Sequence, residues 1–211
     1  MTEASSRVDG RKLRYAGRRD ELLRAVTAYV LEQGVGQLAI RPMAESVGVS
    51  HATLLNHFGT KENLITEVVD LLRQQSMPID PEAPIPDDVA NDAASAIASW
   101  WAAWTHPDYL PALRLTFEVY GQALLHPERY ERFLEDVVGG WLRFFTRVAD
   151  AAGCPPDELE ATGTTLLATM RGLQLDLVAT GDTARANVAL ELLIAEVARR
   201  EALWRETAAD A

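Results

Sequence analysis

The sequence predicts an all-α protein of about nine helices, and three observations support this fold class. Apolar residues recur with the 3.6-residue period of an amphipathic helix along nearly all of the 211 residues. The strict alternation of apolar and polar residues that marks a β-strand is not found in the sequence. Glycines and prolines separate the periodic segments, at positions where helices commonly end or begin.

Four helices are expected in the N-terminal part of the chain. The first is expected over residues 18–33. A short second helix opens near Pro42, which suits the first turn of a helix, and ends at Gly48. A third follows Ser50, whose hydroxyl is placed to cap it, and a fourth runs over residues 61–75.

A proline-rich stretch, "SMPIDPEAPIPDD", follows the fourth helix and predicts a boundary, because it cannot be helical throughout. We therefore expect three regions, residues 1–60, 61–85 and 86–211. The third region should hold five long helices, with "GDT" between the last two supplying a glycine stop and an aspartate cap. These helices are expected over residues 87–105, 109–125, 128–152, 158–180 and 184–206.

The charge is distributed unevenly along the chain, so the net charge of −11 does not exclude a nucleic-acid partner. Residues 1–75 contain ten basic and nine acidic residues, a net of +1, whereas residues 76–211 contain ten and twenty-two, a net of −12. The basic residues near the N-terminus form an arm that could meet phosphate or serve as a disordered solubilising tail. They are Arg7, Arg11, Lys12, Arg14, Arg18, Arg19 and Arg24.

Several function classes are disfavoured by what the sequence lacks. Cys154 is the one cysteine, so no disulfide can form within the chain, and a cytoplasmic location is expected. The most apolar run, residues 93–104, is shorter than the ~20 residues that span a bilayer, so no membrane is expected as partner. There is no nucleophile elbow, glycine-rich phosphate loop or metal-spaced His/Cys set. We therefore expect neither an enzyme nor a cofactor or metal.

The third helix, within "GVSHATLLNHFGTKENL", carries an unusual set of side chains. Leu54 and Phe58 are four residues apart and are expected to point into a small core. The opposite face then carries short uncharged groups, which can approach base edges in a major groove without repulsion. These residues are His51, Ala52, Leu55 and Asn56, with Thr53 and His57 at the flank. The pattern favours a helix-turn-helix, although a plain helical hairpin with a polar outer face fits it as well.

The segment "GQLAIRPMAESVGVSHATLLNHFGTKENLI", residues 36–65, resembles the DNA-binding segment of the TetR/AcrR family of transcriptional repressors. Residues that match the family pattern in register are Arg41, Ala44, Gly48, Val49, Ser50, Thr53, Leu54, His57, Phe58, Lys61 and Leu64. The resemblance implies an N-terminal helix-turn-helix domain for DNA and a C-terminal domain for ligand binding and dimerisation. The predicted DNA-binding residues are Arg41, Ser50, His51, Ala52, Thr53, Leu55, Asn56, His57 and Lys61.

The resemblance also implies which of these residues contact the DNA backbone and which face the bases. Phosphates and groove edges would be held by Arg41, Thr53, His57 and Lys61, and bases would be faced by His51, Ala52 and Asn56. His57 could instead be a structural histidine. Two positions depart from the family pattern. Ala39 replaces a capping threonine, a loss of about 1 kcal/mol, and Leu55 replaces a tyrosine that commonly meets phosphate, so it could contact a thymine methyl group instead.

Aromatic residues are concentrated in the middle helices of the C-terminal region. They are either ordinary core or the lining of a mostly apolar pocket, which in this family would bind a small effector. Glu118 and Asp176 lie near them and could meet a cationic ligand, although Glu118 could pair with Arg114 and Asp176 could be solvated. The predicted ligand-binding residues are Trp100, Trp104, Phe117, Tyr120, Trp141, Phe145 and Met170.

The last two helices are apolar on two sides, so each should bury one side in its own domain and the other against a partner. Resemblance identifies that partner as a second copy of the chain. The sequence thus predicts a homodimeric, ligand-responsive repressor that binds a palindromic double-stranded DNA operator and is released by a small-molecule effector. The alternatives are an activator or dual regulator of the same fold, or a dimeric helical adaptor that does not bind DNA.

Overall fold

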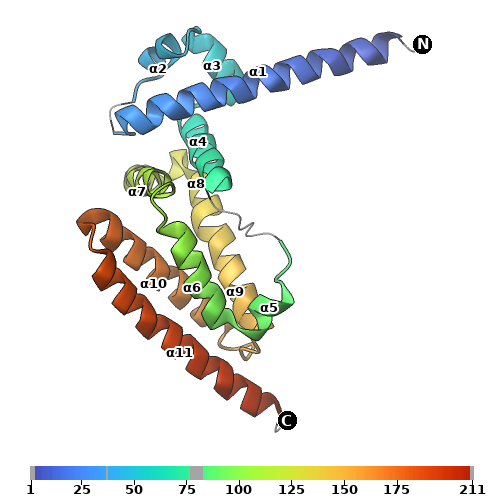
Figure 1. Ribbon diagram of the computed structural model, residues 1–211. Helices are drawn as coiled ribbons and strands as arrows, with labels where there is room; N and C mark the ends of the chain where they lie inside the picture. Colours follow the sequence, from blue (N-terminus) through green and yellow to red (C-terminus); the bar gives the residue numbers. More distant parts are fainter. Residues whose placement is uncertain (1–2, 37, 77–82, 210–211) are drawn as a thin grey trace.

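The computed structural model describes the backbone of residues 3–36, 38–76 and 83–209, and the side chains of these residues except 3–16, 73, 75–76 and 208–209. Throughout these residues the regular structure is helical, which confirms the all-α fold class (Figure 1). The helices are α1 (Glu3–Gln33), α2 (Ile40–Ser46), α3 (His51–Phe58), α4 (Lys61–Ser76), α5 (Asp87–Asn91), α6 (Ala93–Trp104), α7 (Leu110–Leu125), α8 (Glu131–Leu134), α9 (Trp141–Ala151), α10 (Leu159–Thr180) and α11 (Thr183–Ala209). A 3₁₀ turn, η1 (Pro127–Arg129), and a π-helical segment, η2 (Glu135–Gly140), flank α8.

Two of the predicted long helices are interrupted. The helix expected over residues 87–105 breaks at Asp92, whose extended backbone separates α5 from α6 and whose carboxylate accepts a hydrogen bond from Ser95 N at 2.9 Å. The helix expected over residues 128–152 is divided into η1, α8, η2 and α9, with Gly139 and Gly140 inside the π-helical segment. Both segments are thus largely helical as expected, but neither is one continuous α-helix.

The first helix is longer than predicted, because α1 begins at Glu3 rather than near residue 18. Of the basic residues expected to form an N-terminal arm, Arg18 and Arg24 are exposed and Arg19 is partly buried. The side chains of Arg7, Arg11, Lys12 and Arg14 lie outside the described residues.

Helix α4 joins the two ends of the molecule (Figure 1). Its first turns pack against α1 and α3, and its later turns meet α7 and α8. Helices α2 and α3 pack together beside α1, so that one small core is shared by α1 to α4. The predicted division at residues 60 and 85 stays a prediction, since α4 contacts helices on both sides of it.

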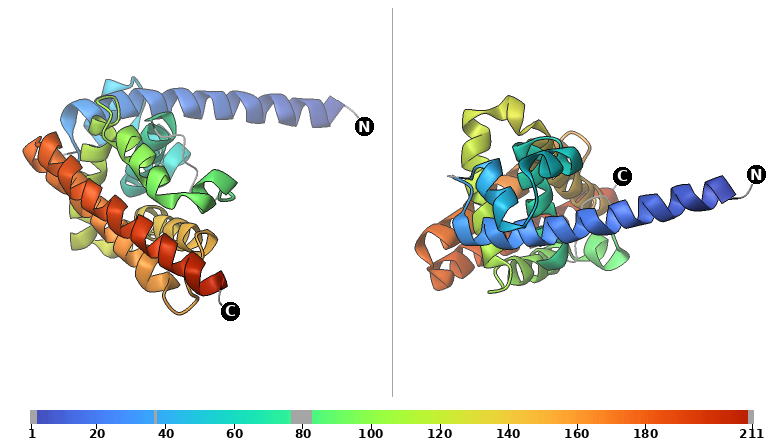
Figure 2. Two further views of the ribbon diagram at one scale, coloured as in Figure 1. Left: turned by 60° about the horizontal axis from the view of Figure 1, so that its bottom comes forward. Right: turned by 90° about the horizontal axis from the view of Figure 1, so that it is seen from above.

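The remaining helices form a second layered body, in which α10 and α11 lie antiparallel along one flank (Figure 2). The turn between them has the predicted chemistry. Gly181 ends α10 in the left-handed conformation, with φ of 71°, and Asp182 accepts a hydrogen bond from Arg185 N at 3.0 Å. Aromatic rings from α6 and α9 fill the centre, with ring centroids 5.1 to 6.5 Å apart.

Helices α9 and α10 approach each other very closely at Gly163. A Cβ atom at this position would lie 3.0 Å from the backbone nitrogen of Thr146 and 3.1 Å from its Cα atom. Only glycine fits there without moving the backbone. The close approach therefore fixes the spacing of these two helices.

Two expectations about the rest of the chain can be compared with the structure. No helix among the described residues is both long enough and apolar enough to cross a bilayer. Cys154 is buried and unpaired, and its thiol donates to Thr162 Oγ1 at 3.6 Å. Burial raises the pKa of this thiol, which keeps it protonated and unreactive.

Candidate functional site

The turn between α2 and α3 is built as its residues predict. Gly48 has φ of 71°, which only glycine adopts without strain. Ser50 then caps α3, because its hydroxyl oxygen accepts a hydrogen bond from Thr53 N at 3.1 Å. Leu54 and Phe58 are buried, which fixes the rotation of α3 about its axis. Ala39 at the start of α2 makes no capping hydrogen bond, so the predicted loss of that cap is confirmed.

The face of α3 opposite this core is open to solvent. His51, Ala52 and Asn56 are exposed, and Leu55 exposes 37% of its surface although it is apolar. Thr53 and His57 are partly buried at the edge of the face, and Arg41 on α2 is exposed. The structure thus brings the predicted DNA-binding residues of α3 onto one surface of a short helix. Their binding role stays a prediction.

Arg19 of α1 holds α3 in place through three separate interactions. Its Nε donates to the backbone oxygen of His57 at 3.3 Å, and its guanidinium carbon Cζ lies 4.7 Å from the centre of the Phe58 ring. The same group donates to both carboxylate oxygens of Glu67 on α4, at 2.7 and 2.6 Å. We call these contacts the Arg19 clamp. The sequence placed Arg19 in a basic arm and gave no sign of this role, which depends on contacts 38 and 48 residues away.

Two other predicted DNA-binding residues have partners within the protein. The Lys61 ammonium group donates to the backbone oxygen of Leu38 at 2.7 Å and so ties the start of α4 to the segment before α2. His57 lies beside the clamp, and burial together with the positive charges of Arg19 and Arg18 lowers its pKa. His57 is therefore neutral at neutral pH.

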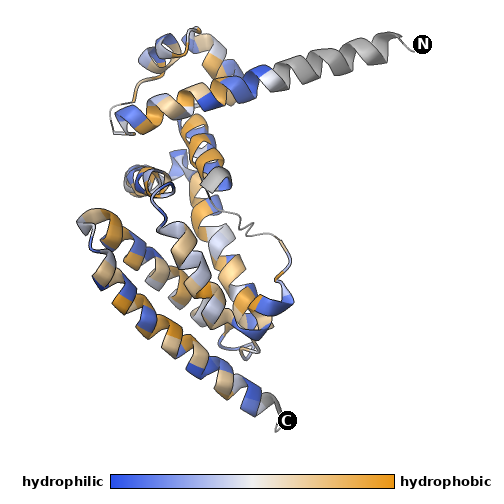
Figure 3. Cartoon of the chain, in the orientation of Figure 1, coloured by the Kyte–Doolittle hydropathy of each residue, from blue (hydrophilic) through white to orange (hydrophobic). Residues whose placement is uncertain are grey.

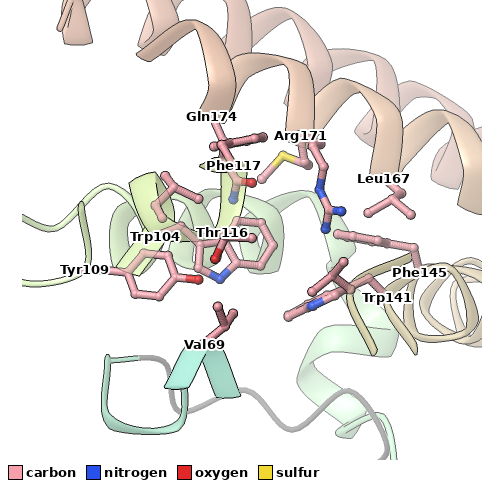
Figure 4. Close-up of a pocket in the computed structure, with 13 residues that line it drawn as sticks. Val69, Trp104, Tyr109, Thr116, Phe117, Trp141, Phe145, Leu167, Arg171 and Gln174 are labelled. Atoms are coloured by element: carbon pink, nitrogen blue, oxygen red, sulfur yellow. The ribbon is translucent and has the colours of Figure 1, made fainter. Parts of the chain in front are cut away.

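A small cavity of about 40 Å³ lies among α4, α6, α7, η2, α9 and α10 (Figure 4). Five of the seven predicted ligand-binding residues line it, and their role in binding stays a prediction. The complete lining is Val69, Trp104, Tyr109, Leu113, Thr116, Phe117, Val137, Trp141, Phe145, Leu167, Met170, Arg171 and Gln174. The sequence analysis missed two polar members on α10, Arg171 and Gln174, because their spacing marks them only as members of an amphipathic helix.

The other two predicted ligand-binding residues lie outside this lining. Trp100 is buried in the aromatic core, where its ring packs against Phe144 and Phe145 at 5.1 and 6.1 Å between centroids. Tyr120 lines a separate depression of about 350 Å³ on the outer side of α10. Its hydroxyl accepts a hydrogen bond from Arg171 at 3.2 Å, and the guanidinium lies 5.3 Å from the ring centre. Neither residue therefore lines the cavity with the other five, and the predicted ligand-binding role of Trp100 and Tyr120 stays a prediction.

The two acidic residues considered for a cationic ligand are engaged elsewhere. Glu118 does not pair with Arg114. Its carboxylate accepts a hydrogen bond from Val35 N at 2.7 Å, which ties α7 to the turn after α1. Asp176 is paired with Arg185 at 2.7 Å rather than simply solvated. Neither residue lines the cavity.

The outer side of the α10–α11 hairpin is apolar. Val188, Leu192 and Leu175 expose 61%, 72% and 49% of their surfaces, and Ala195 lies exposed on the same side of α11 as the first two. Figure 3 shows apolar and polar residues alternating along α11 at the edge of the molecule. Leu190 and Val197 on the inner side are buried. Helix α11 is thus apolar on both sides, as predicted, and one side is uncovered.

Comparison with known proteins extends this picture. A 54-residue segment is 35% identical to the HTH-type transcriptional repressor KstR2 of Mycolicibacterium smegmatis, and the match spans 26% of this chain and 26% of that repressor. The similarity to that curated relative is therefore confined to about a quarter of its length. No protein-family model matches the chain.

Solved structures share the architecture over most of the chain. A transcriptional regulator from Rhodococcus sp. RHA1 superimposes with a TM-score of 0.64 at 19% identity, covering 86% of this chain and 96% of that one. A Rhodococcus sp. protein assigned to the TetR family gives 0.64 at 18% identity, covering 86% and 97%. The multidrug binding protein EbrR, solved with imidazole, gives 0.59 at 21% identity, covering 84% and 88%. The chain has the fold of the TetR-family transcriptional regulators.

Proposed function

We propose that the chain is a ligand-responsive transcriptional repressor that binds a palindromic DNA operator as a homodimer and releases it when a small effector binds. The observation that carries the proposal is the open face of α3, whose His51, Ala52 and Asn56 are exposed on a helix held rigidly by a cap and the Arg19 clamp. The partial similarity to the repressor KstR2 supports it.

The chemistry of this face suits a major groove. An asparagine amide can pair with the N6 and N7 atoms of adenine, and alanine leaves room for a thymine methyl group. No carboxylate lies on α3 to repel the phosphates. The apolar side chain of Leu55 can contact the methyl group of thymine. Asn56 is therefore assigned to base recognition, with Arg41 and Thr53 at the phosphates.

The uncovered apolar side of α10 and α11 supports a dimer. Three large apolar residues that expose about half or more of their surfaces lie on this hairpin, and such patches commonly mark protein interfaces. Two copies of the hairpin related by a two-fold axis would bury both patches in a four-helix bundle. The two α3 helices would then read half-sites about 34–36 Å apart, or a multiple of that spacing.

Helix α4 links the cavity to the reading helix in this proposal. Val69 of α4 lines the cavity, and Glu67, two residues earlier, holds the Arg19 clamp. The cavity of about 40 Å³ is far smaller than the roughly 300 Å³ typical of small-molecule sites. An effector must therefore move a wall to enter, and moving the α4 wall displaces Glu67 and with it the anchor of α3.

Arg132 of α8 supplies a second connection between α4 and the cavity wall. Its guanidinium lies 3.6 Å from Glu67 and 3.4 Å from Asp70 on α4, and 3.7 Å from Asp136 in η2. Val137, the next residue in η2, lines the cavity. A ligand that binds more tightly to a conformation with a different position of η2 or α4 would shift the protein toward that conformation. The two α3 helices would then be wrongly placed for the operator, and the DNA would be released.

DNA binding can be tested by a mobility-shift titration with duplexes from the region upstream of the chain's own gene. We expect specific binding that weakens steeply as salt is raised. Asn56→Ala should weaken it by about 1–3 kcal/mol, roughly 5- to 150-fold. Asn91→Ala is the matched control, because Asn91 is also exposed but lies on α5. Absence of specific binding by the wild type would contradict the proposal and favour the adaptor, whereas equal binding by wild type and Asn56→Ala would contradict the role assigned to Asn56.

The dimer can be tested by sedimentation of two matched variants. Leu192 on α11 and Leu124 on α7 are almost equally exposed, at 72% and 73%. We expect Leu192→Asp to give a monomer, while Leu124→Asp stays a dimer like the wild type. A dimer that survives Leu192→Asp and is lost in Leu124→Asp would move the interface to α7.

A further inference from the structure

The charge of the cavity lining is opposite to that of the region around it. Residues 76–211 carry ten basic and twenty-two acidic residues, yet the only charged side chain in the described lining is Arg171. The rest of the lining is apolar or aromatic apart from Thr116, Tyr109 and Gln174. No carboxylate is available there to receive a cation.

Arg171 is not neutralised by the protein. Among the described residues, no Asp or Glu oxygen lies within 4.0 Å of its guanidinium, and its contacts are the hydroxyl and ring of Tyr120. A tyrosine hydroxyl uses one of the five N–H donors of a guanidinium. In Figure 4 the Arg171 side chain points from α10 toward Trp141 and Phe145. The group is therefore held at the cavity with donors to spare.

A second donor in the lining also lacks a partner. Trp104 is 3% exposed, and its indole Nε1 is buried with no hydrogen bond. A buried N–H without an acceptor costs about 1–3 kcal/mol, so an acceptor atom in the cavity would stabilise the site. Figure 4 shows the Trp104 ring between Tyr109 and the α10 residues, on the side of the cavity nearest Val69. The cavity lining thus holds one unsatisfied indole N–H and one guanidinium with further N–H groups, and both groups are donors.

We propose that the occupant of this cavity is an anionic, flat or flexible apolar molecule that ends in a carboxylate. The carboxylate accepts hydrogen bonds from Arg171, and the apolar part packs among the rings of Trp104, Trp141 and Phe145. Arg–carboxylate pairing is bidentate and gains strength away from bulk water. The inference rests on the proposed function only in naming this molecule the effector. It replaces the expectation of a cationic ligand, because Glu118 and Asp176 face elsewhere.

The position of Arg171 also indicates a path into the cavity. Arg171 and Leu167 line both the inner cavity of about 40 Å³ and the outer depression of about 350 Å³. When the guanidinium leaves Tyr120 for a carboxylate, the two spaces join. The outer depression then serves as an entrance, while room for the ligand inside still requires a wall of the cavity to move, because 40 Å³ is far below the roughly 300 Å³ of small-molecule sites. Arg171 then serves as both the anchor of the acid group and the barrier that the ligand displaces.

Calorimetric titration with matched probes tests the ligand class on the full-length wild-type protein. The probes are 2-naphthoate and 2-naphthamide, and decanoate and decanamide, so that each acid has a neutral isostere. We expect at least one acid to bind tenfold or more tightly than its amide. Arg171→Gln should reduce that ratio below threefold, and Arg171→Lys should keep part of it. Arg185→Gln, which removes an exposed guanidinium on α11, should leave the ratio unchanged.

A ratio below threefold for both pairs in the wild type overturns the proposal, as does the absence of binding by either acid at millimolar concentration. A ratio that survives in a folded Arg171→Gln protein also overturns it. Should that variant fail to fold, the wild-type ratio and Arg171→Lys decide. Operator release separates the two proposals. An acid that binds through Arg171 without releasing DNA supports the anionic ligand class and contradicts ligand-dependent release of the operator. Release by neutral ligands alone supports ligand-dependent release and contradicts the anionic ligand class.

Discussion

The open face of α3 and the lining of the cavity differ in what holds them. The α3 face is positioned by a serine cap and one arginine, and its residues His51, Ala52, Leu55 and Asn56 are exposed. The cavity is lined partly by rings of the aromatic core, in which Phe145 packs against four other rings at 5.5 to 6.5 Å between centroids. Residues of the first region can therefore change with little effect on stability, whereas those of the second cannot. Recognition of an operator and stability of the fold are thus separable by mutation.

Phe145→Ala should give the largest loss of stability. Phe145 is 1% exposed, and removing its ring leaves a hole that the neighbouring rings cannot fill. We expect the free energy of unfolding to fall by about 3–5 kcal/mol. Urea unfolding followed by circular dichroism measures the change. Leu55→Ala on the α3 face should stay within about 0.5 kcal/mol, and a comparable loss in both variants would remove the contrast between the regions.

Arg19→Met should have the next largest effect, since it removes the charged clamp but keeps an apolar side chain of similar length. The loss of hydrogen bonds to Glu67 and to the His57 backbone should lower the free energy of unfolding by about 1.5–3 kcal/mol. Operator affinity should fall as well, because α3 loses its anchor. Arg18→Met is the matched control for stability, because Arg18 is exposed next to it. Equal destabilisation by both variants would show that the clamp is not special.

Substitutions at the two cap positions of the helix-turn-helix should change the free energy of unfolding in opposite directions. Ser50→Ala removes the hydrogen bond to Thr53 N and should lower the free energy of unfolding by about 1 kcal/mol. Ala39 has the extended backbone of a cap, with φ of −113° and ψ of 142°, so Ala39→Thr should raise it by up to about 1 kcal/mol. Thermal melting of the pair measures both. A stabilising Ser50→Ala would show that the cap hydrogen bond contributes nothing.

The smallest expected effect is a pH dependence from His57. Its pKa is lowered in the folded protein by burial and by Arg19 and Arg18, so the unfolded chain binds the proton more readily. Stability should therefore fall as the pH drops through the ordinary histidine range near 6.5 and below. Unfolding at about pH 5.5 and 7.5 should show a smaller fall for His57→Gln than for wild type. An equal fall in wild type and His57→Gln would show that His57 is not the cause.

The parts of the fold that local chemistry dictates could be predicted from the sequence. Ser50, Gly48, Gly181 and Asp182 act through hydrogen bonds and backbone angles within a few residues, and each does what its residue type indicates. The rotation of α3, and so its open face, followed from the four-residue spacing of Leu54 and Phe58. Five residues of the cavity lining were predicted because large aromatic residues on facing helices have few places to go.

Features that depend on distant segments could not be predicted. Glu118 bonds to a turn 83 residues earlier, and Arg19 to a carboxylate 48 residues later. Nothing in the helical period separates these residues from ordinary surface charges. Arg171 was missed for the same reason. Trp100 was assigned to the pocket as one of the aromatic residues concentrated in the middle helices. The break at Asp92 was missed because an aspartate inside a periodic run is indistinguishable from a solvated one until its cap geometry is known.

The close contact at Gly163 limits which helices can move when the cavity widens. Since α9 and α10 meet backbone to backbone there, they behave as one rigid slab that carries Trp141, Phe145, Met170 and Arg171 together. A ligand that enters the cavity cannot separate α9 from α10. The cavity must therefore widen on the side of α4, which contributes a single side chain, Val69, to the lining. Expansion of the interior is thereby channelled toward the end of the molecule that holds α3.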